Sequence, residues 1–179
     1  MSPFHFIIKK EILKRADLIP SRILTLDQAA RKAGALRLSG KKIAFTNGVF
    51  DILHQGHIFS LSEAAKTADF LFVGLNADAS VKRLKGNSRP INNQTDRAIV
   101  LAGLSSVDYV VIFDQDDPYD LISAIQPDVL VKGGDWKIEQ IIGSDIVKRR
   151  GGEVLSLSFI EGKSTTKIID KVVSNNGTS

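Results

Sequence analysis

From residue 41 onward, short apolar runs alternate with amphipathic helical segments, and this alternation constrains the fold most strongly. The predicted strands span residues 42–46, 69–75, 109–113, 128–131 and 153–159. The predicted helices begin near residues 55, 93, 117, 137 and 164. Repeated strand–helix units favour parallel strands joined by right-handed crossovers. We therefore predict an α/β fold with a doubly wound, five-stranded parallel sheet.

Residues 1–40 have a different character. They hold eight Lys/Arg against three Asp/Glu, whereas the other 139 residues hold sixteen against seventeen. Apolar residues at helical spacing predict two helical pieces, interrupted at Pro20 and closed by Gly40. We expect a helical extension at 1–40, one domain at 41–173 and a polar tail at 174–179. The positive charge lies in the extension and forms no basic stripe with aromatics, so we expect no nucleic-acid partner.

The composition indicates a cytoplasmic protein that does not contact a membrane. No run is long and apolar enough to span a bilayer, and the first residues lack the features of a signal peptide. Cysteine is absent, which excludes disulfides and thiolate metal sites. The apolar N-terminal helices favour packing on the core or a homodimer contact.

Residues 45–57 predict a polyphosphate site. An apolar strand ends in Gly48, and His54 and His57 follow around Gly56, where a helix begins. Unpaired N–H groups at a helix start attract anions, and imidazoles can add hydrogen-bond donors. Parallel sheets bind ligands beyond the carboxyl ends of their strands, at the switch in strand order. A metal site on the two histidines is a weaker alternative, since only His5 remains as a further histidine.

Three segments together resemble a known family. Residues 45–57 resemble the HxGH signature of the cytidylyltransferase-like nucleotidylyltransferases, which have a Rossmann-like fold. Residues 132–136 resemble the glycine/aspartate turn near the nucleotide base in that family, and residues 161–166 resemble its second phosphate-binding signature. Residues 74–86 and 89–92 are most similar to the heptose 1-phosphate adenylyltransferase group, which also occurs fused to a heptose kinase.

The resemblance implies a reaction. This group transfers AMP from ATP to D-glycero-β-D-manno-heptose 1-phosphate by direct in-line attack, giving ADP-heptose for lipopolysaccharide-type glycans and pyrophosphate. Mg²⁺ is expected as the cofactor because it neutralises triphosphate charge, although the sequence shows no dedicated metal cage. The resemblance also implies a homodimer and a separate sugar kinase acting upstream, unless the chain is part of a bifunctional protein.

The resemblance also assigns roles to residues. It implies catalytic roles for His54, His57 and Lys85, with Lys85 in a glycine-flanked loop. The predicted acceptor-binding residues are Asp51, Arg89 and Arg97; the alternatives are local capping for Asp51 and surface salt bridges for the arginines. The predicted nucleotide-binding residues are Asn47, Gly48, Val49, Phe50, Gly56, Gly133, Gly134, Asp135, Glu161, Gly162, Ser164, Thr165 and Thr166.

Two other functions stay open. A cytidylyltransferase would use CTP and glycerol 3-phosphate or a similar phospho-alcohol; relatives that use CTP often carry an arginine before the second signature, where this chain has Phe159 and Ile160. A non-catalytic nucleotide-binding module could share the fold. The joint presence of both histidines, Lys85 and the Ser-Thr-Thr segment favours an enzyme.

Overall fold

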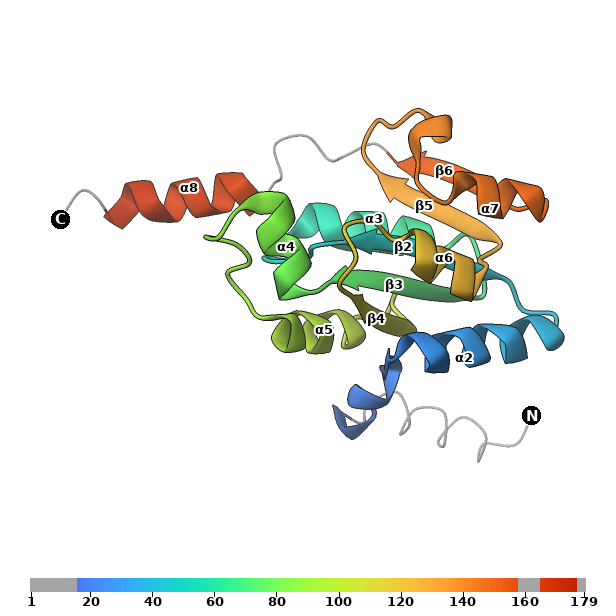
Figure 1. Ribbon diagram of the computed structural model, residues 1–179. Helices are drawn as coiled ribbons and strands as arrows, with labels where there is room; N and C mark the ends of the chain where they lie inside the picture. The colour runs from blue at the N-terminus through green and yellow to red at the C-terminus, as the bar shows by residue number, and fades with distance from the viewer. Residues whose placement is uncertain (1–15, 158–164, 177–179) are drawn as a thin grey trace.

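A computed structural model describes residues 16–157 and 165–176. Its strands are β1 (Ile23–Leu24), β2 (Ile43–Gly48), β3 (Phe70–Asn76), β4 (Tyr109–Phe113), β5 (Val129–Gly133) and β6 (Glu153–Leu157). They form one sheet in the order β1-β4-β3-β2-β5-β6, and every pairing is parallel (Figure 1). The predicted doubly wound parallel sheet is confirmed, with one strand more than the predicted five.

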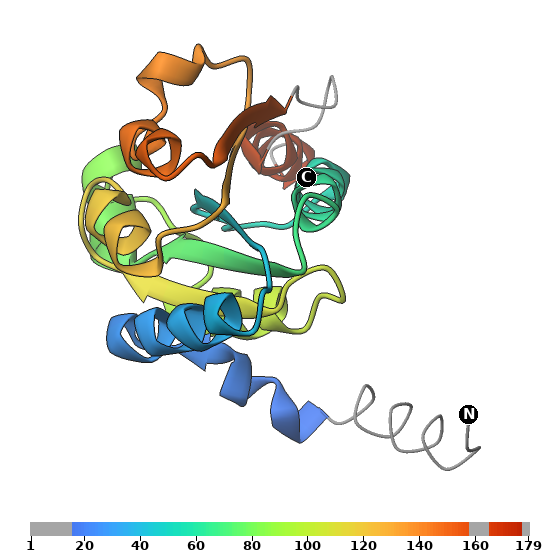
Figure 2. The same cartoon turned by 90° about the vertical axis from the view of Figure 1, so that its right-hand side faces the viewer.

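Helices cover both faces of the sheet (Figure 2). The α-helices are α2 (Leu26–Leu38), α3 (Gln55–Ala65), α4 (Asp78–Lys85), α5 (Gln94–Ala102), α6 (Tyr119–Ile125), α7 (Ser144–Arg149) and α8 (Thr165–Asn176). Short 3-10 turns are η1 (Ala16–Leu18), η2 (Pro20–Arg22) and η3 (Ile138–Gln140). Helices α2, α6 and α7 pack on one face, and α3 and α5 pack on the other.

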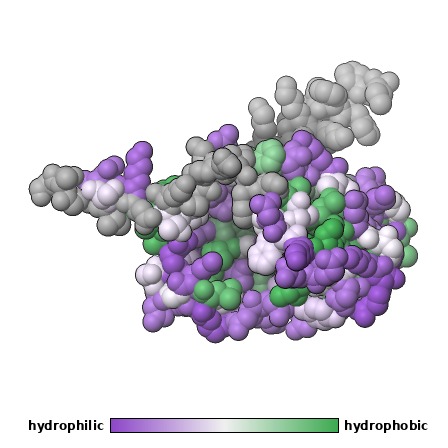
Figure 3. Space-filling model, turned by 90° about the horizontal axis from the view of Figure 1, so that it is seen from above, coloured by the Kyte–Doolittle hydropathy of each residue, from purple (hydrophilic) through white to green (hydrophobic). Residues whose placement is uncertain are grey.

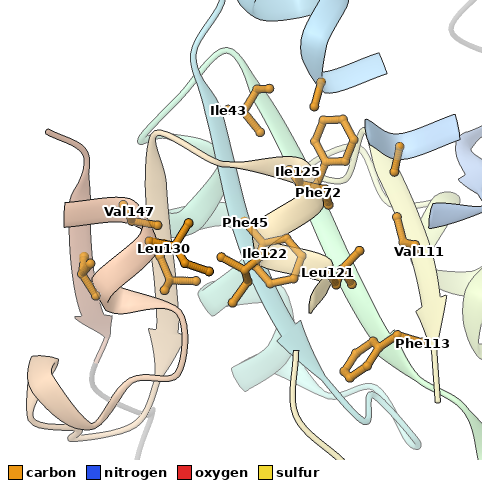
Figure 4. Packing of buried hydrophobic residues seen from close by; sticks show 14 of the residues in the cluster. Ile43, Phe45, Phe72, Val111, Phe113, Leu121, Ile122, Ile125, Leu130 and Val147 are labelled. Atoms are coloured by element: carbon orange, nitrogen blue, oxygen red, sulfur yellow. The ribbon is translucent and has the colours of Figure 1, made fainter. Parts of the chain in front are cut away.

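The central strands are buried on both faces. Phe45 and Leu130 belong to the cluster under α2, α6 and α7, where Figure 4 shows them facing the α6 side chains. Ala44 and Val131 belong to the cluster under α3 and α5. Since successive side chains of a strand point to opposite faces, this alternation fixes which face each residue near the carboxyl ends takes.

The extra strand lies inside the predicted extension. β1 has two residues, and Ile23 pairs with Val110 of β4 at the sheet edge. Helix α2, which the alanine-rich pattern predicted, packs Ala29 and Ala33 into the same core as Phe45. Both alanines are fully buried, so this part of the basic segment is built into the sheet's own packing.

Two predicted segments differ in detail. Residues 76–92, where Lys85 was expected to lie in a loop, contain α4, which begins with an acidic residue and ends with basic ones, as the helix dipole favours. The helix expected from residue 137 is divided into η3 and α7 at Gly143. That glycine has φ +84°, and a Cβ there would lie 2.6 Å from Cδ1 of Ile122, so only glycine fits.

Helix α8 starts beside the body and projects from one end of the molecule (Figures 1 and 3). In the view of Figure 3, hydrophilic side chains cover most of the coloured surface, with apolar groups between them. In the described part of the chain, no helix is long and apolar enough to cross a bilayer.

Candidate active site

The candidate site lies where the strand order switches. From β2 the chain builds the sheet in one direction through β3 and β4, then crosses back to place β5 on the other side of β2. Ligands of doubly wound sheets bind beyond the carboxyl ends at this point. Asn47 and Gly48 end β2, and Gly133 ends β5, so the first and second predicted motifs meet at the switch.

The two histidines are oriented by backbone amides at the start of α3. His54 is the N-cap, and its Nδ1 accepts from the Gly56 N–H at 3.1 Å. The N–H of His54 donates to Nδ1 of His57 at 3.4 Å, and the two rings stack with centroids 3.9 Å apart. Because a neutral imidazole that accepts at Nδ1 carries its proton on Nε2, these contacts assign both rings the Nε2–H tautomer. Each ring therefore carries its N–H donor at Nε2.

His57 is neutral at pH 7. Burial, followed by repulsion from neighbouring His54 when that ring is protonated, lowers the pKa of His57 from 6.5 to about 4. Its ring also lies 5.4 Å from the ring of Phe50, whose φ is +45°. A Cβ at Gly48 would lie 3.0 Å from the Phe50 ring, so the glycine allows the aromatic contact that shields His57. Neutral His57 can donate a hydrogen bond without titrating.

The start of α8 lies beside the loop between β2 and α3. Oγ1 of Thr165 donates to the carbonyl oxygen of Ile52 at 3.3 Å. The starts of α3 and α8 are therefore close together (Figures 1 and 2). Thr166 is exposed. The predicted residues Glu161, Gly162 and Ser164 lie outside the described residues, as does Phe159.

Asp51 holds the segment that precedes α5. Its carboxylate accepts from Nε of Arg89 at 2.7 Å and from the backbone N–H groups of Ile91 and Asn92 at 2.8 and 2.9 Å. Burial by itself raises the pKa of Asp51, but the hydrogen bonds from Asn92, Ile91 and Arg89 lower it below its ordinary value. With a side chain only 1% exposed, Asp51 faces this segment.

Arg97 is buried at the centre of the same region. Its Nε donates to the carbonyl of Asn92 at 2.9 Å, and its Nη1 donates to the carbonyls of Val49 and Asn76 at 2.6 and 2.9 Å. Its Nη2 pairs with Asp78 at 2.7 Å. A phosphate could reach this guanidinium only by replacing contacts that join residues 49, 76–78 and 92–97.

Lys85 is the last residue of α4 and is exposed. The predicted loop around it was therefore wrong: the glycine that follows, Gly86, has φ +92° and ends the helix. The polar composition of α4 hides a helix that buries only Ser80 and Val81. Lys85 extends from a helix end, where a long cationic side chain is free to reach a bound ligand.

A hydrogen-bonded turn follows the end of β5. Gly134 has φ +111°, and its N–H donates to the carbonyl of Leu157 at 2.7 Å. The indole N–H of Trp136 donates to the carbonyl of Gly133 at 3.0 Å, and Asp135 is exposed. The predicted base-side residues are thus held by β6 and by Trp136.

The sequence analysis did not include Lys132 among the candidate site residues. Its Nζ donates to Oδ1 of Asn47 at 3.3 Å, linking the ends of β5 and β2. Burial lowers the pKa of Lys132. The signal in the sequence is a lysine directly after the apolar run 129–131, which puts a cation at the carboxyl end of a buried strand.

The described residues contain no cluster of three or more His, Cys, Asp or Glu side chains that could hold a metal ion. They therefore provide no protein cage for Mg²⁺. In phosphoryl-transfer sites that ion is bound largely through substrate phosphates.

A cavity of about 630 Å³ lies elsewhere, between α2 and the amino end of β4. Arg22, Asp108 and Tyr109 contribute to its lining. Since Tyr109 begins β4 and the histidines lie beyond the carboxyl end of β2, this cavity is not part of the candidate site.

Sequence comparisons agree with the motifs. Residues 45–171 match the family model described as Cytidylyltransferase-like. The bifunctional protein HldE of Wolinella succinogenes is 55% identical over 151 residues, a match that covers 84% of this chain and 31% of that protein. The HldE protein of Campylobacter concisus is 61% identical over 132 residues, covering 74% and 27%. The chain spans about a third of the length of these curated relatives.

Solved structures share the fold. The lipopolysaccharide core biosynthesis protein from Thermoplasma volcanium is 26% identical, with a TM-score of 0.56 and coverage of 69% of this chain and 100% of that one. The pantoate-beta-alanine ligase from Francisella tularensis has a TM-score of 0.56 at 16% identity, which shows the fold alone. Because the family model covers most of the chain and the HxGH histidines begin α3 at the switch point, this chain belongs to the cytidylyltransferase-like family of nucleotidyltransferases.

Proposed function

We propose that the chain transfers AMP from ATP to D-glycero-β-D-manno-heptose 1-phosphate, giving ADP-heptose and pyrophosphate. The observation that carries this is the approach of the α8 start to the histidine loop, through the Thr165–Ile52 hydrogen bond. Two helix starts and two imidazole donors then face one region, as binding of a nucleotide tail requires. Similarity to the HldE proteins, and to a protein named for lipopolysaccharide core biosynthesis, supports the choice of acceptor.

The reaction needs positioned charge and no covalent intermediate. An oxygen of the sugar phosphate forms a bond to the α-phosphorus of ATP while the bond from that phosphorus to the bridging oxygen breaks, and the electron pair leaves with pyrophosphate. The Nε2–H groups of His54 and His57 donate to oxygens whose negative charge grows during transfer. Lys85 reaches the same phosphates from the end of α4. Mg²⁺ bound with ATP would neutralise further triphosphate charge.

Asp51 and Arg97 act in this proposal as positioning residues. Together they fix residues 89–92 against the end of β2. Among the described residues, Arg89 pairs with Asp51 through Nε, which leaves its Nη groups to bind the acceptor. Arg89 thus keeps its predicted acceptor-binding role, whereas Asp51 and Arg97 support the segment that presents Arg89 and do not contact the acceptor directly. Gly133, Gly134 and Asp135 are proposed to border the base or ribose.

Pyrophosphate release tests the proposal, with ATP and CTP each combined with heptose 1-phosphate and glycerol 3-phosphate. We expect release only with ATP and heptose 1-phosphate. His57→Ala should lower turnover about a hundredfold or more, the scale of losing one positioned donor, while His5→Ala, the same change at a histidine outside the motif, should not. Turnover only with CTP would contradict the substrate assignment, and no release with any pair would favour a non-catalytic module.

Three further expectations stay predictions: a separate sugar kinase that supplies the acceptor, a homodimer, and a cytoplasmic location. The curated relatives are named bifunctional, and this chain matches about a third of their length. Gel filtration with light scattering of the whole chain would test the homodimer.

A further inference from the structure

Lys132 differs from the other cations around the site. Arg97 pairs with Asp78, and Arg89 pairs with Asp51. In the described ranges 16–157 and 165–176, no carboxylate oxygen lies within 4.0 Å of the Lys132 ammonium. Its neighbours are a neutral amide oxygen and an aromatic ring.

The two neighbours define where the ammonium lies. Oδ1 of Asn47 is 3.3 Å from Nζ, and the centroid of the Trp136 ring is 6.0 Å away. Desolvating an ammonium is unfavourable unless an anion or several hydrogen bonds compensate. One long hydrogen bond to an amide and one distant ring compensate only in part. An ammonium whose desolvation is only partly compensated favours binding of an anion, which would supply the missing electrostatic partner.

The face of the sheet on which Lys132 lies indicates which anion this lysine binds. Leu130 and Phe45 belong to the cluster under α2, α6 and α7. Strand side chains alternate between faces, so Lys132 and Asn47, each two residues further on, lie on that same face. The histidines begin α3, which packs on the opposite face. The cation and the imidazole donors therefore approach the switch point from opposite sides of the sheet.

In-line transfer requires the nucleophile and the leaving pyrophosphate on opposite sides of the α-phosphorus. If the histidines and the starts of α3 and α8 hold the triphosphate, the attacking group enters from the other side. We propose, on the basis of the proposed function, that Lys132 with Asn47 binds the phosphate of the acceptor sugar 1-phosphate and directs its oxygen toward the α-phosphorus.

Steady-state kinetics of Lys132→Met, Lys132→Arg and the control Lys137→Met test this. Lys137 is an exposed lysine of the same segment. Lys132→Met should raise the KM for the acceptor about 10- to 100-fold, the range of a charge-assisted hydrogen bond, and change the KM for ATP less than about threefold. Lys132→Arg should recover part of the loss, and Lys137→Met should match the wild type. An unchanged acceptor KM, or a larger rise in the KM for ATP, would overturn the proposal.

Stability separates ligand binding from a structural role. Because no carboxylate of the described residues pairs with this ammonium, Lys132→Met should keep or raise the Tm of the ligand-free protein. A Tm lowered by more than about 5 °C would show that Lys132 stabilises the ligand-free fold and would overturn the proposed anion-binding role. For a protein of this length, one kcal/mol shifts Tm by a few degrees.

A binding measurement separates failure of Lys132 from failure of the proposed function. Calorimetry would titrate heptose 1-phosphate, and separately inorganic phosphate, into protein saturated with α,β-methylene ATP. If the wild-type protein shows no measurable binding of heptose 1-phosphate, the proposed acceptor is wrong. The role of Lys132 then depends on the Kd for inorganic phosphate. A Kd at least tenfold higher in Lys132→Met than in the wild type supports an anion site at Lys132, and an equal Kd overturns it.

Discussion

The low pKa of His57 makes stability depend on pH in a defined window. The unfolded chain binds the His57 proton with an ordinary pKa of 6.5, whereas the native protein binds it near 4. Between these values the unfolded state holds more protons, so stability falls as pH falls. The pKa difference corresponds to a loss from this residue of about 2 kcal/mol between pH 7 and pH 5.

Urea denaturation of the wild type and of His57→Asn at both pH values measures that loss. The asparagine keeps a polar group near the Nδ1 position that accepts from the His54 N–H, and it does not titrate. We expect the wild type to lose about 2 kcal/mol more than the variant between pH 7 and pH 5. The His57 ring resonances should titrate with a midpoint near 4. Parallel losses in the two proteins, with a ring midpoint near 6.5, would refute the reasoning.

Three further substitutions test the scaffold. Arg97→Met should lower the free energy of unfolding by about 3 kcal/mol, because it leaves buried carbonyls and a carboxylate without their partner; a loss below about 1 kcal/mol in urea denaturation would contradict the buried network. Gly74→Ala should cost about 1–3 kcal/mol, since the new Cβ would lie 2.8 Å from Cζ of Phe45; an unchanged Tm would show that the strand adjusts freely. Thr165→Val removes the hydrogen bond to Ile52 and should raise the KM for ATP several-fold at nearly constant stability. An unchanged KM for ATP would show that α8 does not contribute to nucleotide binding.

The sequence predicted the elements whose signal is local. Buried parallel strands are continuous apolar runs, and the strand predicted at 109–113 coincides with β4. A helix was predicted to begin near residue 93, and the Asn93 side chain caps α5 by accepting from the N–H of Asp96 at 3.0 Å. The switch point followed from the strand–helix alternation, because strand order in such folds obeys few topologies.

The missed elements depend on tertiary contacts. β1 has two residues and exists through its pairing with β4, so it has no periodicity to detect. α4 is mostly polar and buries one apolar side chain, Val81, which resembles a loop in composition. The break at Gly143 reflects the approach of Ile122 from a distant helix.

The motifs of the site could be predicted from the sequence, but the hydrogen bonds and ion pairs that connect its residues could not. Nothing in the spacing of Asp51 and Arg89 indicated that they form an ion pair, and nothing indicated that Arg97 would be buried under three backbone carbonyls. Lys132 was visible as part of a motif, but its separation from any described carboxylate emerges only when β5 is placed beside β2.

The central claim is that one nucleotide tail lies between the histidine pair and the start of α8. A crystal structure of the whole chain with α,β-methylene ATP tests it most directly. We expect phosphate oxygens within hydrogen-bond distance of Nε2 of both His54 and His57, with the backbone of α8's first turn against the same phosphates. A triphosphate bound away from the imidazoles, such as in the cavity at the amino end of β4, would contradict it.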